Sequence, residues 1–142
     1  MQGTQLRYAI KFVADMDKAV KFYRDVLGLK LKFESPGWSE FVTGETTLAL
    51  HPSSDRNSAG KVELGFTVPD VEASYRDMTA KGVLFSMPPK KQDFGGVLAQ
   101  FVVRLDFREI QQCCICENWG WQYCGDNAKQ EKTAGGMHGE VA

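Results

Sequence analysis

A strand-and-helix pattern occurs twice along this sequence of 142 residues. In each copy an apolar run leads to an aspartate, at Asp15 and at Asp70, and a helical periodicity follows that ends at Gly28 and at Gly82. An aspartate suited to cap a helix N-terminus and a glycine just after the last turn are typical helix boundary signals. Such a repeat indicates two similar structural units within one chain.

Short apolar runs surround both helical stretches and predict the strands of the two halves. In the first half they cover residues 8–13, 29–34, 38–43 and 46–51, and in the second half 62–68, 83–87, 97–103 and 107–112. Separators rich in glycine and proline, Pro88 and Pro89 among them, indicate turns between the strands, and the polar residues 52–60 are the expected linker. Each half is therefore predicted to be a βαβββ unit.

The expected fold class is α+β, with two βαβββ repeats at about residues 5–51 and 61–112. One such unit leaves a face of its sheet uncovered, whereas two joined units form a curved mixed sheet around a cleft with the helices outside. We expect one domain over residues 1–112 and an atypical C-terminal extension over residues 113–142. Residues 41–50 align with residues 101–110 without a gap, so Glu109 takes the place that Ala49 has in the first half.

Charge and hydropathy exclude several classes of partner. The chain has 17 basic and 18 acidic side chains, and its net charge of -1 provides no basic surface for nucleic acid. No segment approaches the roughly 20 apolar residues of a membrane-spanning helix, and the polar N-terminus lacks the apolar core of a secretory signal. We therefore expect a cytoplasmic protein with neither nucleic acid nor membrane as a partner.

All four cysteines lie near the C-terminus, at Cys113, Cys114, Cys116 and Cys124. A disulfide framework would be spread along the chain, and structural zinc sites usually pair their cysteines as Cys-x-x-Cys. This cluster fits neither pattern, which favours either buried reduced thiols or an unselected terminal extension.

The stretch from Asp15 to Leu29, which contains Phe22-Tyr23 and Leu27-Gly28, resembles the vicinal oxygen chelate superfamily. This superfamily includes glyoxalase I, bleomycin-resistance proteins and extradiol dioxygenases. A weaker copy of the stretch follows Val68, and the resemblance covers about residues 5–103. It implies the βαβββ fold and a homodimer with clefts near or across the subunit interface.

Enzymes of that superfamily usually hold a divalent metal with four side chains, one from each of four inner strands. The resemblance places Tyr8, Ala49, Glu63 and Glu109 at these positions. Alanine cannot bind a metal, and a neutral phenol is a poor ligand at pH 7. We therefore expect no complete metal site and no cofactor, with Glu63 and Glu109 as the remaining candidate ligands.

Strand alternation predicts which side chains face the cleft. They are mostly aromatic or aliphatic with a few polar groups, which is the usual composition of a small-molecule pocket. The predicted cleft residues are Tyr8, Ile10, Phe12, Trp38, Phe41, Thr47, Ala49, His51, Glu63 and Thr67.

Three of these residues have competing interpretations. Glu63 is either a general base, a binding partner for a cationic ligand group, or a solvated or locally paired acid near a strand start. His51 is either a general base or hydrogen-bond donor, or else a structural or surface residue at a strand end. Trp38, which follows a Pro-Gly turn, is expected at the rim of the cleft or at a subunit interface rather than in the core.

The preferred hypothesis is a protein that binds and sequesters a small organic molecule, similar to bleomycin-resistance proteins and without a complete metal site. The alternative is a metal-dependent lyase of the glyoxalase I type, with Glu63 and Glu109 as metal ligands. A third possibility is an interaction module with a vestigial cleft. The sequence does not identify the ligand or a role for residues 113–142.

Overall fold

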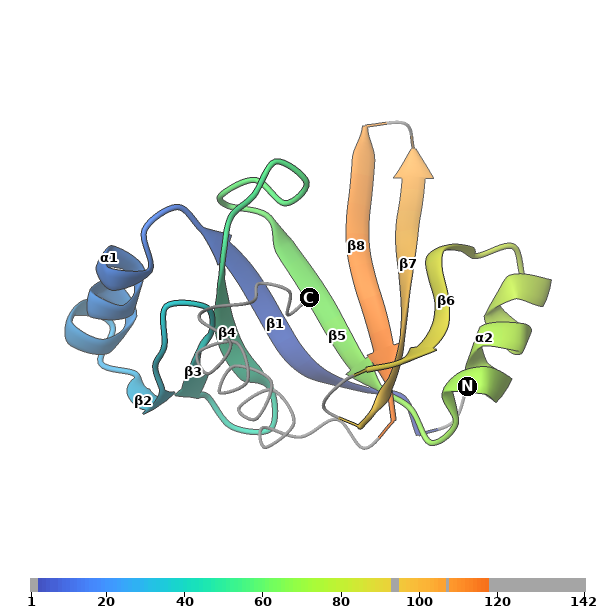
Figure 1. Ribbon diagram of the computed structural model, residues 1–142, viewed down its shortest axis with the longest axis horizontal. Coiled ribbons are helices and arrows are strands. Elements are labelled where there is room, and N and C mark those ends of the chain that lie inside the picture. The colour runs from blue at the N-terminus through green and yellow to red at the C-terminus, as the bar shows by residue number, and fades with distance from the viewer. Residues whose placement is uncertain (1–2, 93–94, 107, 118–142) are drawn as a thin grey trace.

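The computed structural model describes residues 3–92, 95–106 and 108–117. Eight strands in this part of the chain form one mixed sheet in the order β2-β3-β4-β1-β5-β8-β7-β6 (Figure 1). The first half contributes β1 (Gln5–Val13), β2 (Lys30–Phe33), β3 (Ser39–Val42) and β4 (Thr47–Pro52). The second half contributes β5 (Val62–Thr67), β6 (Leu84–Lys91), β7 (Val97–Asp106) and β8 (Glu109–Cys116).

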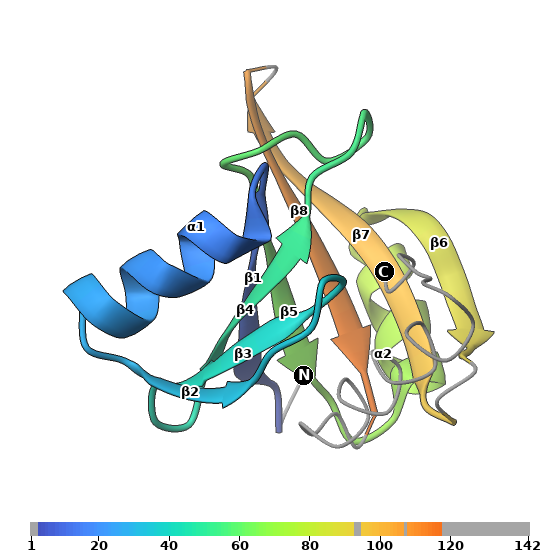
Figure 2. The same cartoon turned by 60° about the vertical axis from the view of Figure 1, so that its left-hand side comes forward.

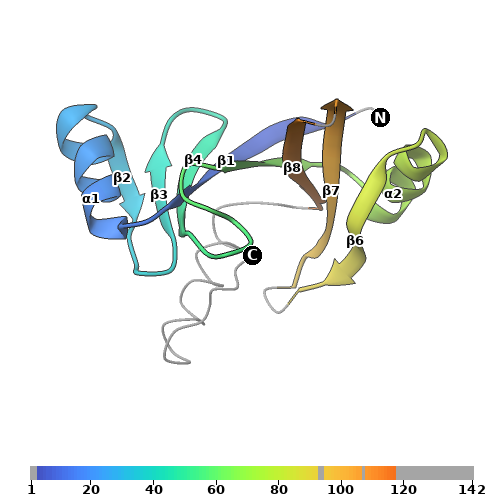
Figure 3. The ribbon, with the colours of Figure 1, turned by 90° about the horizontal axis from the view of Figure 1, so that it is seen from above.

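The strand order is symmetric about the central pair of β1 and β5. β1 is parallel to β4 and β5 is parallel to β8, while the antiparallel pairing of β1 with β5 joins the two halves. Figure 3 shows that both outer sets of strands turn to the same side of this central pair. The predicted α+β class, with two βαβββ repeats in one curved mixed sheet, is confirmed.

The helical segments lie at opposite ends of the sheet. α1 (Met16–Lys21) continues as the π-helical turn η1 (Phe22–Val26), and α2 (Val71–Ala80) belongs to the second half (Figure 2). The Asp15 carboxylate accepts a hydrogen bond from the Lys18 amide at 3.0 Å, and Asp70 accepts one from the Ala73 amide at 3.0 Å. Each such cap stabilises its helix by about 1 kcal/mol.

Strand alternation divides the core between the two faces of the sheet. On the outer face, each helical segment packs against its own half. The first outer cluster consists of Val13, Val20, Phe41 and Leu50. The second consists of Val68, Val71, Met78, Ala99, Phe101, Cys113 and Ile115. The opposite face, here called the inner face, carries the cluster of Tyr8, Ile10, Phe12, Trp38, Ala49, Cys114 and Cys116.

The prediction that Pro88 and Pro89 separate two strands is wrong, because both prolines lie within β6. Among the described strands, β6 is at the edge of the sheet and pairs with β7 alone. Its pairing is irregular between Met87 and Lys90. An edge strand tolerates proline because the missing N–H group costs no ladder hydrogen bond on its open side.

The predicted domain boundary at residue 112 is also wrong. β8 continues to Cys116, and residues 113–116 pair with both β5 and β7. Their side chains alternate between the two clusters, with Cys113 and Ile115 on the outer face and Cys114 and Cys116 on the inner face. These three cysteines are reduced and behave as small apolar residues, so they complete the domain. The rest of the predicted extension, with Cys124, lies outside the described residues.

No helix among residues 3–92, 95–106 and 108–117 has the length and apolar character that crossing a bilayer requires.

Candidate functional site

A row of paired residues crosses the inner face from the first half to the second. Glu40 on β3 pairs with Ala49 on β4, Ala49 pairs with Ile10 on β1, and Ile10 pairs with Glu63 on β5. Residues that pair directly across a sheet point to the same side. Two buried carboxyl groups therefore flank a small apolar surface made by Ile10 and Ala49.

Glu40 is fully buried, and its one described side-chain hydrogen bond comes from Trp38, two residues earlier in the chain. The Trp38 indole N–H donates to Glu40 Oε2 at 2.7 Å, whereas Oε1 has no hydrogen-bond partner within the described residues. Burial raises the pKa of the Glu40 carboxyl to about 7, although the Trp38 hydrogen bond and the positive charge of Lys32 oppose the shift. This carboxyl group therefore changes charge near neutral pH.

The prediction that Phe41 lines the cleft is wrong. Phe41 is buried in the outer cluster with Val20 and Leu50, and its ring centroid lies 5.8 Å from that of Tyr23. Trp38 and Phe41 are three positions apart on an extended chain, so they cannot share a face. Glu40 takes the inner position that was assigned to Phe41. The period of two, counted from Trp38, could have identified it.

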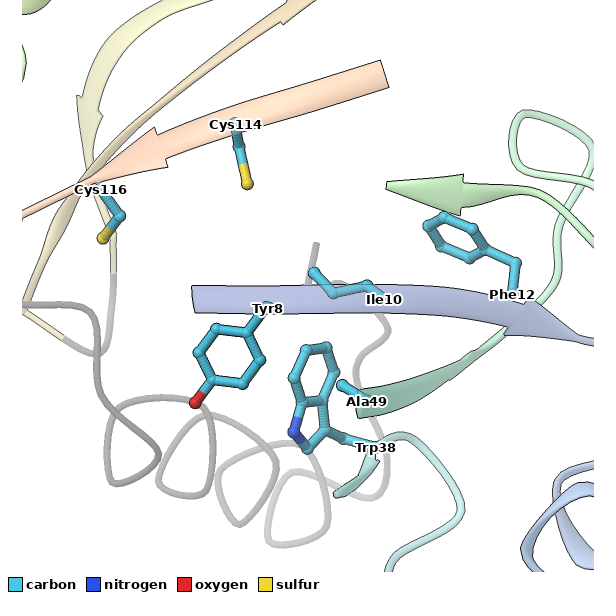
Figure 4. Packing of buried hydrophobic residues seen from close by; sticks show 7 residues of the cluster. All are labelled: Tyr8, Ile10, Phe12, Trp38, Ala49, Cys114 and Cys116. Carbon is cyan, nitrogen blue, oxygen red and sulfur yellow. The ribbon is translucent and has the colours of Figure 1, made fainter. Parts of the chain in front are cut away.

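Trp38 lies in the core rather than at a rim, with 2% of its surface exposed. Figure 4 shows its indole beside Tyr8 and Ala49 on the inner face. Its ring centroid lies 6.1 Å from that of Tyr8 and 6.2 Å from that of His51. The Ser35 hydroxyl fixes the preceding turn, since it accepts from the Trp38 amide at 3.0 Å and donates to the Trp38 carbonyl at 2.8 Å.

His51 extends the aromatic part of the inner face and is buried. Its ring lies 5.3 Å from that of Phe12, and its Nδ1 is 2.8 Å from the Pro52 carbonyl oxygen. Burial lowers the pKa of His51 below its ordinary value, so the imidazole is neutral at pH 7. This environment agrees with the structural interpretation of the residue.

The two threonines among the predicted cleft residues lie at strand ends, Thr47 at the start of β4 and Thr67 at the end of β5. Thr47 pairs with Tyr8 at the start of β4 and is partly buried. The Thr67 hydroxyl donates to the Cys116 carbonyl at 3.3 Å, so it links β5 to β8.

A polar cavity of about 90 Å³ lies over the second half of the inner face, and we call it the Glu63 cavity. Glu63 is 6% exposed. Burial raises the pKa of its carboxyl above the ordinary value, while the Cys114 and Gln100 side chains and the positive charge of Arg56 lower it in part. The lining residues are Arg56, Asn57, Glu63, Ser86, Gln100, Phe101, Val102, Gln112 and Cys113.

The fourth metal-ligand position of the superfamily belongs to Cys114 and not to Glu109. Ile10 precedes the cap residue Asp15 by the same number of residues as Gly65 precedes Asp70. Because Ile10 pairs in parallel with Ala49 and Gly65 pairs in parallel with Cys114, Cys114 is the counterpart of Ala49. Glu109 is exposed at the turn between β7 and β8, where its amide donates to the Asp106 carboxylate at 3.1 Å.

The four positions therefore hold Tyr8, Ala49, Glu63 and Cys114. Only Glu63 and Cys114 have side chains that commonly bind divalent metals, and burial with a neighbouring Glu63 charge raises the pKa of the Cys114 thiol, which opposes the thiolate form. Within the described residues, no three side chains of histidine, cysteine, aspartate or glutamate are grouped so that they could hold a metal ion. These residues do not fit the metal centre that the superfamily implies.

The family model for the Glyoxalase/Bleomycin resistance protein/Dioxygenase superfamily matches residues 5–108. An uncharacterised protein of Mycolicibacterium smegmatis is 30% identical over 83 residues, which are 58% of this chain and 71% of that protein. The crystal structure of a hypothetical protein from Bacillus halodurans superimposes with a TM-score of 0.66 at 18% identity, covering 84% of this chain and 97% of that one. Methylmalonyl-CoA epimerase from Mycobacterium tuberculosis gives a TM-score of 0.59 at 18% identity, covering 84% and 91%. At such identities the two structures support the fold alone.

Proposed function

Because the chain belongs to the Glyoxalase/Bleomycin resistance protein/Dioxygenase superfamily and lacks the superfamily's usual metal ligands at Tyr8 and Ala49, we propose that it binds and sequesters a small organic molecule on its inner face. The observation that carries the proposal is the Glu63 cavity, where polar side chains from several elements converge around one buried carboxyl group. A few polar groups next to an apolar surface are the usual composition of a ligand site.

The volume of the Glu63 cavity indicates that only part of the ligand enters it. Pockets for whole drug-sized ligands measure roughly 300–1,000 Å³, whereas the Glu63 cavity measures about 90 Å³. It therefore suits one polar group of a larger molecule. The rest of that molecule would extend beyond the cavity, because Ile10, Tyr8 and Trp38 of the adjacent inner cluster are themselves buried.

Two measurements on the purified protein test this proposal. A thermal-shift screen of small aromatic, amide and amine compounds is expected to yield a binder whose affinity falls at least tenfold in Glu63→Ala. Gln111→Ala, on the outer face of β8, is the matched control, because the Gln111 side chain donates to the Val62 carbonyl and lies outside the cavity.

Elemental analysis of the same samples is expected to give no stoichiometric transition metal. Nickel, zinc, iron or manganese retained by the wild-type protein and lost in Glu63→Ala would overturn the proposal in favour of the glyoxalase-type lyase.

A second candidate function is metal-independent proton transfer, and Glu40 is the observation that favours it. A carboxyl group with a pKa of about 7 and one oxygen without a described partner changes its protonation state near neutral pH. Glu40 is fully buried, so proton exchange with a ligand requires that the side chains covering it move. Epimerisation at carbon is a reaction of this kind, and the solved structures with a similar fold include methylmalonyl-CoA epimerases. If a ligand found in the screen exchanges a C–H hydrogen with D₂O in the wild-type protein and not in Glu40→Gln, the protein is an enzyme of this class.

We also propose a cytoplasmic homodimer, since closed twofold assemblies are the commonest oligomers and the superfamily resemblance implies a dimer. Light scattering after size-exclusion chromatography tests this proposal, and a monomer at micromolar concentration would overturn it.

A further inference from the structure

The charges around the Glu63 cavity balance one another. Glu63 is the one acidic side chain of its lining, and Arg56 is the one basic side chain. The remaining polar groups are neutral: the carboxamides of Asn57, Gln100 and Gln112 and the hydroxyl of Ser86. When Glu63 is ionised, it and Arg56 leave the lining without net charge, so neither sign of ligand charge is favoured. When Glu63 is protonated, the one charge that remains belongs to Arg56, whose side chain is exposed and therefore screened by solvent.

The neutral lining groups all combine donors with acceptors. Each carboxamide offers two N–H bonds and a carbonyl oxygen, and a hydroxyl offers one donor and two lone pairs. A protonated carboxyl adds an O–H donor beside a carbonyl acceptor in one plane. Burial raises the pKa of Glu63, which favours this protonated form. Gln100 lies beside the carboxyl on β7, and Arg56 comes from the linker between the halves.

The size of the cavity limits what enters it. Its volume of about 90 Å³ exceeds the roughly 10–15 Å³ that a single water needs and is well below the roughly 300–1,000 Å³ of a pocket for a whole ligand. This accommodates a flat group of a few non-hydrogen atoms, such as a carboxamide with its first carbon.

We propose that the Glu63 cavity is a subsite for a neutral, planar donor–acceptor group of the ligand, namely a carboxamide, ureide or lactam edge. Glu63 forms a two-point hydrogen bond with this group, and Gln100 and Gln112 satisfy its remaining donor and acceptor. The inference rests on the proposed ligand-binding function and specifies the chemistry of its polar end. An unpaired buried donor or acceptor is costly, so a site of this kind discriminates strongly between groups of the same shape.

Four fragments of the same shape test the subsite on the full chain. Benzamide is neutral with donor and acceptor, benzamidine is a cation, benzoate is an anion, and acetophenone offers an acceptor alone. Dissociation constants are measured by NMR titration of the ¹⁵N-labelled protein at millimolar fragment concentration. We expect benzamide to bind at least tenfold more tightly than each of the other three, with shifts at β5, β7 and β8.

The variants separate hydrogen-bond chemistry from charge. Glu63→Gln keeps a planar donor and acceptor, so benzamide affinity is expected to stay within about threefold, whereas Glu63→Leu is expected to lose at least tenfold. Gln112→Leu is expected to weaken benzamide binding severalfold, and Gln111→Leu, on the opposite face, to leave it unchanged. Should Glu63→Leu fail to fold, Gln100→Leu replaces it with the same expected direction.

If benzamidine binds most tightly of the four fragments, or if Glu63→Gln lowers benzamide affinity tenfold, Glu63 acts as a charged carboxylate. Either result would overturn the proposal that the subsite takes a neutral donor–acceptor group. Absence of benzamide binding to the wild-type protein would overturn it as well. Neither result bears on the sequestering function itself, which the ligand screen and the metal analysis decide separately.

Discussion

The Trp38 indole nitrogen lies 2.7 Å from Glu40 Oε2 on the inner face of the sheet, although Trp38 was expected at the rim of the cleft or at a subunit interface. This contact joins a buried aromatic side chain to a buried carboxyl group two residues away. It explains why the side chain of Glu40 is oriented inward while its second oxygen is left without a described partner.

The stability of the protein is expected to depend on pH through Glu40. Its pKa rises from 4.5 to about 7 on folding, so the folded state binds more protons than the unfolded state between these values. The free energy of unfolding therefore falls as pH rises from about 4.5 to 7, by about 3 kcal/mol for this one group, and levels off above that range. Urea denaturation at pH 5 and pH 8 measures the change.

Glu40→Gln isolates this contribution from that of Glu63, whose pKa is shifted in the same direction. The variant keeps an acceptor for Trp38 and cannot ionise, so it is expected to match the wild type at pH 5 and to exceed its stability at pH 8. Equal stability of the two proteins at both pH values would contradict the assignment.

Trp38→Phe is expected to destabilise the protein at pH 8 by about 2–3 kcal/mol, because a buried carboxylate loses its donor. The loss in free energy of unfolding should shrink when the same substitution is made in Glu40→Gln, where no charge is left without a partner. A double-mutant cycle from urea denaturation yields this coupling, and independence of the two substitutions would count against it.

The described cysteines are expected to react slowly with iodoacetamide in the folded protein. Burial raises the pKa of Cys113 to about 11 and that of Cys116 to about 12, so little thiolate exists at pH 8. At pH 8 these thiols should react with iodoacetamide more than about 100-fold more slowly than an exposed thiol does. Peptide mass spectrometry locates each modified residue. Labelling in roughly 6 M guanidinium chloride, which unfolds the protein, provides the reference rate. Rapid labelling of Cys116 in the folded protein would argue against its position in β8.

Restoring metal ligands tests the register of β8. Tyr8→His with Ala49→Glu and Cys114→Glu, together with the native Glu63, should create four donors on the inner face and bind about one equivalent of nickel or zinc. The control variant with Tyr8→His, Ala49→Glu and Cys114→Ala keeps Glu63 and the exposed Glu109 but has only three donors on the inner face, so it should bind far more weakly. Equal metal content in both variants, measured by elemental analysis, would contradict the placement of Cys114.

The repeated pattern of strand, aspartate, helix and glycine determined the fold from sequence alone. Local chemistry suffices there, since Asp15 and Asp70 cap their helices whatever lies around them. Strand alternation likewise placed Tyr8, Ile10 and Glu63 on a common face, which the register of β1 and β5 confirms.

Tertiary structure decided what local patterns leave open. The gap-free alignment put Glu109 at the fourth inner position, but the longer hairpin of β7 and β8 moves Cys114 there, because pairing with β5 sets the register. Pro88 and Pro89 remain in a strand because β6 lies at the edge of the sheet. Glu40 becomes a buried acid because its strand packs one face on α1 and turns the other inward. Sequence defines the alternation along each strand, but only pairing between strands decides which side chains meet.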